Sequence, residues 1–147
     1  MKKLICFITI IFSLIFVSSC GIFNSTPSRS SINLEYVGTY EMVNISGTLT
    51  YKGYTIKLDK SLYKYFRVTL SEDGTALVES GQANTTTVYS ASGTWSDNGN
   101  IINIISYVNG EAIVEQMTWD NGKITYITRQ TISGIICNIK VVLKKET

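Results

Sequence analysis

Histidine is absent from this chain, proline occurs once and cysteine occurs three times in 147 residues. Without histidine the chain lacks the commonest metal ligand and the commonest general base, so we expect neither a zinc or copper site nor any other cofactor. Charged residues are also few, at 16%, and the formal net charge is +2. Because so small a charge cannot neutralise a run of phosphates, nucleic acid is not expected as a partner.

What the chain has instead is an apolar, globular composition. Hydrophobic residues make up 44% of it, and glycine contributes 11 residues. This composition excludes a disordered or collagen-like chain. A length of 147 residues corresponds to one domain together with a targeting segment.

The first twenty residues have the layout of a secretory signal peptide. Lys2 and Lys3 form a short basic region, and residues 4–17 are apolar apart from two hydroxyl side chains. That run is too short for a transmembrane helix, which needs roughly 20 apolar residues. At its end, Val17-Ser18-Ser19-Cys20 places an aliphatic residue three positions before a cysteine, with small residues between them.

This tetrapeptide resembles the lipobox of bacterial lipoproteins. The resemblance implies cleavage between Ser19 and Cys20, a diacylglyceryl thioether on Cys20, and acylation of the new amino group, as with palmitate. Two or three acyl chains hold a protein on a membrane durably. The membrane is then a partner through the lipid anchor, on the extracytoplasmic side of a bacterial membrane, which is the outer membrane if the source is Gram-negative. The alternative is an ordinary signal peptide without lipidation.

Three segments are therefore expected along the chain. Residues 1–19 are the lipoprotein signal peptide, residues 20–34 are the lipidated cysteine and a flexible tether, and residues 35–147 are the folded domain. The tether contains the one proline and is rich in serine, threonine and asparagine. Because Cys6 leaves with the signal peptide, Cys137 has no partner and no intramolecular disulfide is expected.

The folded domain has the pattern of an all-β, up-and-down antiparallel β-barrel. Valine, isoleucine, threonine and tyrosine recur in short runs, and Asp-Gly or Asn-Gly pairs typical of hairpins separate several of them. A meander with one apolar face can close on itself, which removes its unpaired edges. We expect eight or nine strands, with a break near Gly93 left open, at residues 36–46, 49–57, 64–71, 75–80, 85–96, 100–107, 111–119, 123–131 and 135–144.

Three motifs of this domain resemble those of bacterial lipocalin-like domain proteins. Gly38-Thr39-Tyr40 opens the first strand, Leu70-Ser71-Glu72-Asp73-Gly74-Thr75 forms a hairpin, and Gly93-Thr94-Trp95 precedes the turn at Asp97-Asn98-Gly99. The resemblance covers about residues 35–145 and implies a lipocalin-like barrel in a family that contains many lipoproteins. In the wider lipocalin pattern a tryptophan stands where this chain has Tyr40.

An eight-stranded barrel is either packed solid by side chains or holds one small ligand. Aromatic side chains suit the lining of such a pocket, and the candidate pocket for a small hydrophobic ligand consists of Tyr40, Phe66, Trp95, Trp119 and Tyr126. The mouth of that pocket would be lined by Tyr51, Tyr54, Tyr63 and Tyr65. In the alternative interpretation, the tryptophans close one end of the barrel and the tyrosines coat its surface.

Two patterns with catalytic potential are weak. Ser61-Leu62-Tyr63-Lys64 matches the Ser-x-x-Lys of penicillin-interacting serine enzymes, but the companion motifs are absent from the sequence, and a turn capped by Ser61 is the simpler interpretation. Glu111 and Glu115 share one face of an expected strand, and Glu72-Asp73 shares a turn. Charged residues beside turns are usually solvated, whereas acid–base catalysis needs a buried carboxyl. No catalytic residue is therefore predicted.

The sequence thus predicts a lipid-anchored, non-catalytic bacterial cell-envelope protein with a lipocalin-like barrel. Cys137 is expected on the inward face of its strand as a small, inert, buried side chain. Two functions stay open: a barrel that binds a small hydrophobic ligand, and a solid-cored barrel that acts as a structural or protein-interaction component with an unknown protein partner.

Overall fold

The computed structural model describes residues 32–108, 111–132 and 134–147, and this part of the chain is almost entirely β-strand. Two short 3-10 helices are present, η1 (Leu34–Tyr36) and η2 (Lys60–Leu62). The strands are β1 (Gly38–Tyr51), β2 (Tyr54–Leu58), β3 (Tyr63–Leu70), β4 (Thr75–Gln82), β5 (Val88–Asn98), β6 (Ile101–Val108), β7 (Glu111–Asp120), β8 (Lys123–Ile132) and β9 (Ile135–Lys145).

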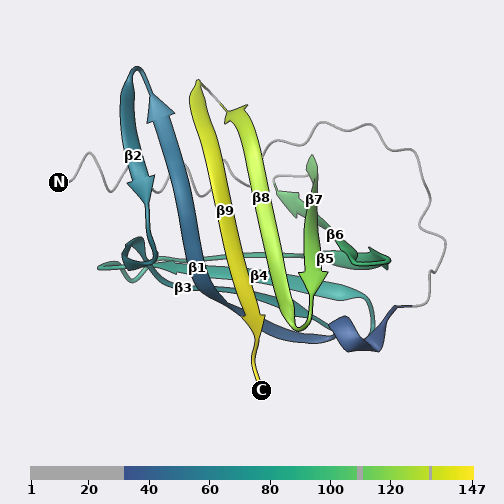
Figure 1. Ribbon diagram of the computed structural model, residues 1–147. Coiled ribbons are helices and arrows are strands. Elements are labelled where there is room, and N and C mark those ends of the chain that lie inside the picture. The colour runs from purple at the N-terminus through teal and green to yellow at the C-terminus, as the bar shows by residue number, and fades with distance from the viewer. Residues whose placement is uncertain (1–31, 109–110, 133) are drawn as a thin grey trace.

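The strands form one antiparallel sheet that closes on itself. Their order is β2-β1-β3-β4-β5-β6-β7-β8-β9, and a further pairing joins β1 to β9. Eight strands therefore make the barrel, and β2 is an extra strand along the second half of β1. Figure 1 shows β9, β8 and the end of β1 crossing β3 and β4 at a steep angle, the arrangement of an orthogonally packed barrel. The predicted antiparallel barrel is confirmed.

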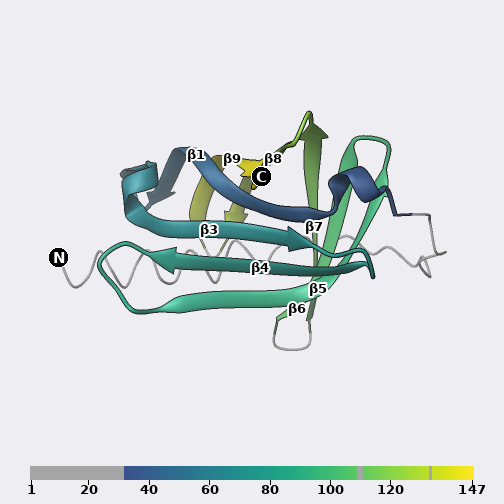
Figure 2. The ribbon, with the colours of Figure 1, turned by 90° about the horizontal axis from the view of Figure 1, so that it is seen from below.

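β1 closes the barrel because it bends from one set of strands to the other. Its first residues pair with β3, and from Tyr40 to Tyr51 it pairs with β9, with an irregularity between Met42 and Asn44. From below, β1 is seen passing over β3 and then turning away from it (Figure 2). A strand that turns a corner in this way needs a bulge or a small residue at the bend.

Glycine is the small residue at two such bends, in β1 and in β5. A Cβ atom on Gly47 of β1 would lie 2.0 Å from the backbone oxygen of Asn138, and one on Gly93 of β5 would lie 2.0 Å from the backbone oxygen of Ile105. The expected strand break between residues 46 and 49 is wrong, because Gly47 lets β1 approach β9 and does not form a turn. The turn comes later, at Lys52-Gly53, where both residues have positive φ. β5 likewise runs unbroken through Gly93.

The hairpin turns follow the Asp-Gly and Asn-Gly pairs. Gly74, Gly99 and Gly122 all have positive φ, as these tight turns require. At the first turn, the carboxylate of Asp73 accepts hydrogen bonds from the backbone N–H of Thr75 at 2.9 Å and from its hydroxyl at 2.7 Å. The predicted turn at Asn109-Gly110 lies outside the described residues.

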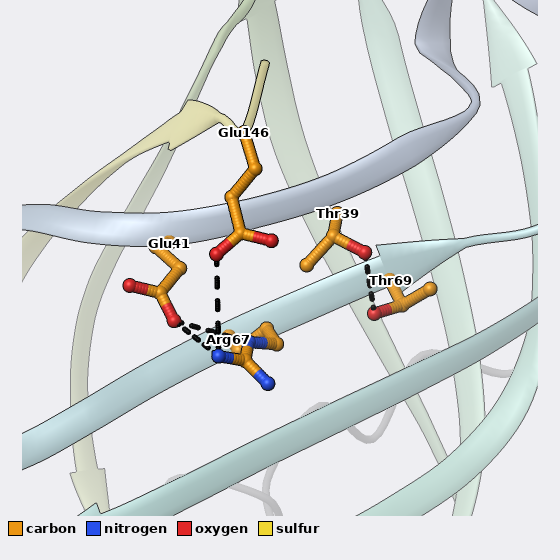
Figure 3. Close-up of polar contacts among 5 residues, drawn as sticks. All are labelled: Thr39, Glu41, Arg67, Thr69 and Glu146. Atoms are coloured by element: carbon orange, nitrogen blue, oxygen red, sulfur yellow. Dashed lines mark hydrogen bonds and ion pairs between the residues drawn. The ribbon is translucent and has the colours of Figure 1, made fainter.

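A small polar cluster covers the outside of the barrel where β1, β3 and the C-terminal residues meet (Figure 3). The guanidinium of Arg67 donates hydrogen bonds to the carboxylate of Glu41 and lies 4.0 Å from that of Glu146, while the hydroxyls of Thr39 and Thr69 are 3.3 Å apart. These charged side chains are partly exposed, and such ion pairs contribute roughly 0–1 kcal/mol. The cluster therefore adds little to stability beside the backbone pairing.

The core consists of the inward-facing side chains of the barrel strands. Alternation along β9 buries every second residue from Ile135 to Leu143, as its sequence pattern predicts. The most completely buried apolar side chains include Tyr40, Val68, Leu70, Ile102, Ile104, Ile124, Ile139 and Leu143, which come from five strands.

Candidate functional site

One end of the barrel interior, next to η1, is aromatic, and the hydroxyls of Tyr36 and Tyr40 are paired there, whereas the buried indole nitrogen of Trp119 has no hydrogen-bond partner among the described residues. The buried hydroxyl of Tyr40 donates to the backbone oxygen of Tyr36 at 2.7 Å, and the hydroxyl of Tyr36 donates to that of Gly99 at 2.7 Å. The rings of Tyr36 and Trp119 lie 4.7 Å apart at 43°. These contacts fasten η1 across this end of the barrel.

Trp95 joins two of the motifs noticed in the sequence. Its indole N–H donates to the backbone oxygen of Ser71 at 2.9 Å, and its backbone N–H donates to that of Gly74 at 2.9 Å. The Gly-Thr-Trp strand is thus bonded to the Asp-Gly-Thr hairpin, with the indole 4% exposed. Trp95 therefore has a structural role, and the hydrogen bond to Ser71 satisfies its indole N–H.

Elsewhere the interior also contains polar side chains. The buried polar residues are Ser80, Gln82, Ser106, Glu115 and Thr128. The hydroxyl of Ser80 and the amide nitrogen of Gln82 are buried without a hydrogen-bond partner among the described residues. Because an unpaired buried polar group costs about 1–3 kcal/mol, such groups in a folded protein call for an explanation.

The registered backbone pairing between β7 and β8 ends near Glu115. Registered pairing between β7 and β8 covers four pairs, from Met117 opposite Tyr126 to Asp120 opposite Lys123. The neighbouring β8–β9 ladder has ten pairs. Beyond Met117 the described residues form no further registered pair between these strands, whose ribbons diverge away from their shared turn (Figure 1), and the next inward-facing residue of β7 is Glu115. We call this place the β7–β8 seam.

Glu115 and Tyr126 meet at the β7–β8 seam. The hydroxyl of Tyr126 donates to Oε1 of Glu115 at 3.1 Å, and Glu115 is 7% exposed. Burial raises the pKa of Glu115 to about 7, although the hydrogen bond from Tyr126 acts in the opposite direction. Burial also raises the pKa of Tyr126, with Thr128 and Cys137 close enough to affect its hydroxyl. The seam thus holds a carboxyl group that titrates near neutral pH.

The structure distributes the five predicted pocket residues over the interior. Tyr40, Trp95 and Trp119 lie toward the η1 end, Tyr126 lies at the β7–β8 seam, and Phe66 faces Ser80 across the β3–β4 pairing.

The four tyrosines expected at a pocket mouth do not form one group. Tyr63 is buried, Tyr54 is 81% exposed, and Tyr65 covers Gly81 on the outer face of β3 and β4. Tyr51 lies opposite Tyr54 in the β1–β2 hairpin.

The weak catalytic patterns are not assembled into a site in the described residues. Ser61 donates its hydroxyl to Asp59, and Asp59, not Ser61 as expected, caps η2 by accepting from the backbone N–H of Ser61 at 2.8 Å. Asp59 is the N-cap because it directly precedes the helical turn, where a side-chain acceptor can reach the first free backbone N–H groups. Lys64 is exposed at the start of β3.

The expectation that the carboxylates are solvated is wrong for Glu115. The sequence contained a signal for this burial, because Met117 and Trp119 set an inward register that places Glu115 on the same face of β7. Glu72 and Asp73 are exposed as expected, and the side chain of Glu111 lies outside the described residues. Within the described part of the chain, no three His, Cys, Asp or Glu side chains gather as a metal site needs.

Cys137 is 2% exposed and faces the interior, which confirms its predicted burial. Burial raises the pKa of its thiol, so it is a poor nucleophile. We expect Cys137→Ala to lower the free energy of unfolding by about 1–3 kcal/mol through the small cavity that it leaves, measured by urea denaturation. An unchanged midpoint would contradict the tight packing around the thiol.

Ser19 and Cys20, the predicted cleavage and lipid-attachment residues, lie outside the described residues. No helix in the described ranges is long and apolar enough to cross a membrane. Comparison of the chain with protein-family models, curated proteins and solved structures finds no match.

Proposed function

We propose that this protein is a non-catalytic lipoprotein of the bacterial cell envelope whose lipocalin-like barrel binds a small, largely hydrophobic ligand. Anchoring is supported by Val17-Ser18-Ser19-Cys20 at the end of an apolar run. A lipid on Cys20 would leave the barrel free outside the membrane, because β1 to β9 close on one another within residues 38–145.

The observation that carries ligand binding is the polar interior. Ser80 is 1% and Gln82 3% exposed, and within the part of the chain that the structure describes each has a polar atom without a hydrogen-bond partner. The registered neighbours of Ser80 are Phe66 on β3 and Tyr89 on β5, so an apolar molecule with polar atoms would find both kinds of contact there. Ligand sites commonly combine apolar walls with a few placed polar groups.

Lipidation can be tested by metabolic labelling. In bacteria fed an alkyne analogue of palmitate, the wild-type chain should take up the label, and Cys20→Ala should lose it entirely and stay at the unprocessed size, because the thiol that receives the diacylglyceryl group is gone. Cys137→Ala is the matched control and should keep the label. Absence of label from the wild-type chain would contradict the anchor.

Ligand binding can be tested with a fluorescent apolar probe. The chain from residue 20 onward, with Cys20 replaced by serine, contains the complete barrel without the lipid; we call it the soluble variant. Titration with N-phenyl-1-naphthylamine should give a saturable fluorescence increase at about one probe per chain, since an eight-stranded barrel has room for one small ligand. A linear, non-saturating signal would contradict a binding site.

The second candidate is a protein-interaction role, favoured by the free edge of β2. This strand pairs with β1 alone, so its other edge has no strand partner in the described part of the barrel. Tyr54 at its start is 81% exposed, and an open edge can pair with a strand of another protein. Failure of the probe to bind would favour this candidate.

A further inference from the structure

The carboxyl group of Glu115 is buried, and no cationic side chain of the described residues is paired with it. Its one hydrogen bond to a described residue comes from Tyr126, at 3.1 Å, and neither ion pair in the described ranges involves it. A carboxylate has room for about four hydrogen bonds, so most of its accepting capacity is unused. Buried carboxylates are normally paired with a cation or several donors.

Glu115 faces the interior of the barrel. It is the first inward-facing residue of β7 beyond the end of the β7–β8 ladder. Opposite it on β6 is Ile104, which is buried and apolar, and Thr128 follows Tyr126 on the inward face of β8. A ligand in the barrel would therefore meet apolar walls and a single carboxyl group at the β7–β8 seam.

We propose that Glu115, positioned by Tyr126, binds the cationic ammonium head of an amphipathic ligand whose apolar part lies inside the barrel. This inference rests on the proposed ligand-binding function and adds the chemical class of the ligand. An ammonium group supplies both the missing positive charge and several N–H donors. A fatty acid would instead place a second negative charge beside Glu115, which like-charge repulsion disfavours.

The same arrangement makes binding depend on pH. The titratable groups around Glu115 are Tyr126 on β8 and, beyond it, Cys137 on β9, and burial raises the pKa of both, so neither carries charge near neutral pH. The described inward side chains of β6, which are Ile102, Ile104 and Ser106, do not titrate. With the pKa of Glu115 at about 7, the carboxylate that attracts an ammonium group forms as the pH rises through 7.

The test uses three ligands of equal chain length on the soluble variant. Octylamine, octanol and octanoate compete with N-phenyl-1-naphthylamine at pH 5.5 and pH 8. Octylamine stays protonated over this range and should bind at least about tenfold more tightly at pH 8 than at pH 5.5. At pH 8 it should also displace the probe at lower concentration than octanol, with octanoate the weakest competitor.

Two variants separate the role of Glu115 from a change in folding. Glu115→Gln keeps the shape and accepts from Tyr126, and it should lose the pH dependence of octylamine binding and the preference for octylamine over octanol. Glu79→Gln, on the outward face of β4, is the matched control and should behave as wild type. Tyr126→Phe removes the donor to the carboxylate and should move the midpoint of octylamine binding to higher pH.

The outcomes distinguish this inference from the proposed function. If the probe binds but octylamine and octanol compete equally at both pH values, the ammonium assignment is overturned and the ligand-binding barrel stands. If Glu115→Gln keeps the octylamine preference, another group recognises the amine and the assignment to Glu115 is overturned. If the probe does not bind at all, the ligand-binding function itself fails.

Discussion

Gly93→Ala is expected to prevent the barrel from closing, with a loss of more than about 3 kcal/mol in the free energy of unfolding. The added Cβ would stand 2.0 Å from the backbone oxygen of Ile105, a position that no side-chain rotation relieves because both groups belong to the backbone framework. Relief requires that β5 and β6 move apart. Circular dichroism and urea denaturation of the soluble variant measure the effect.

Gly99→Ala is the control for this substitution. Gly99 has a φ of 61°, but no atom lies within 4 Å of the position of its Cβ, so alanine there costs only the left-handed backbone conformation, about 1–2 kcal/mol. Gly47→Ala should resemble Gly93→Ala, since its Cβ would meet the backbone oxygen of Asn138 at 2.0 Å. Equal, small losses at all three glycines would contradict the close approach of strands at the two corners.

Glu115→Gln is expected to remove a fall in stability that the soluble variant shows between about pH 4.5 and pH 7. The pKa of Glu115 rises from 4.5 to about 7 on folding, so in this window the unfolded chain releases a proton that the folded chain retains. The contribution of Glu115 to stability is therefore greatest below pH 4.5 and declines as the pH rises through 7. A difference of this size corresponds to about 3 kcal/mol.

Urea denaturation at intervals from pH 4.5 to pH 8.5 measures this dependence. The wild-type midpoint should fall with pH and level off above about 7.5, whereas that of Glu115→Gln should stay nearly constant. The hydrogen-bonded carboxylates of Asp59 and Asp73 have lowered pKa values, so their contributions are lost only as the pH falls below this window. A wild-type curve that is flat from pH 5 to pH 8 would show that Glu115 is not buried.

Much of the barrel could be predicted from the sequence because its signals are local. Alternation along β9 and the Asn-Gly turn at residues 121–122 each depend on a few neighbouring residues, and both are found as expected. Gly47 was misinterpreted because a glycine that forms a turn and a glycine that permits a close approach look alike in sequence. Only the partner strand, which lies some 90 residues away at Asn138, distinguishes the two roles.

The candidate site was harder to predict than the fold. The inward register of Met117 and Trp119 places Glu115 in the barrel. The opposite prediction, that Glu115 is solvated, follows from the general tendency of glutamate to be exposed. Tyr126 is predicted from the sequence only as an aromatic residue of the pocket. Its role as a hydrogen-bond donor to Glu115 depends on where the β7–β8 ladder ends. The ends of ladders follow from the curvature of the whole barrel, which no short motif encodes.

The most direct test of the anchored barrel is the intact mass of the protein extracted from bacterial membranes, together with the sequence of its first peptide. The account predicts a chain that begins at Cys20 and carries a diacylglyceryl group on the thiol and an acyl group on the amino nitrogen. A chain that begins elsewhere, or that begins at Cys20 with an unmodified thiol, would contradict it.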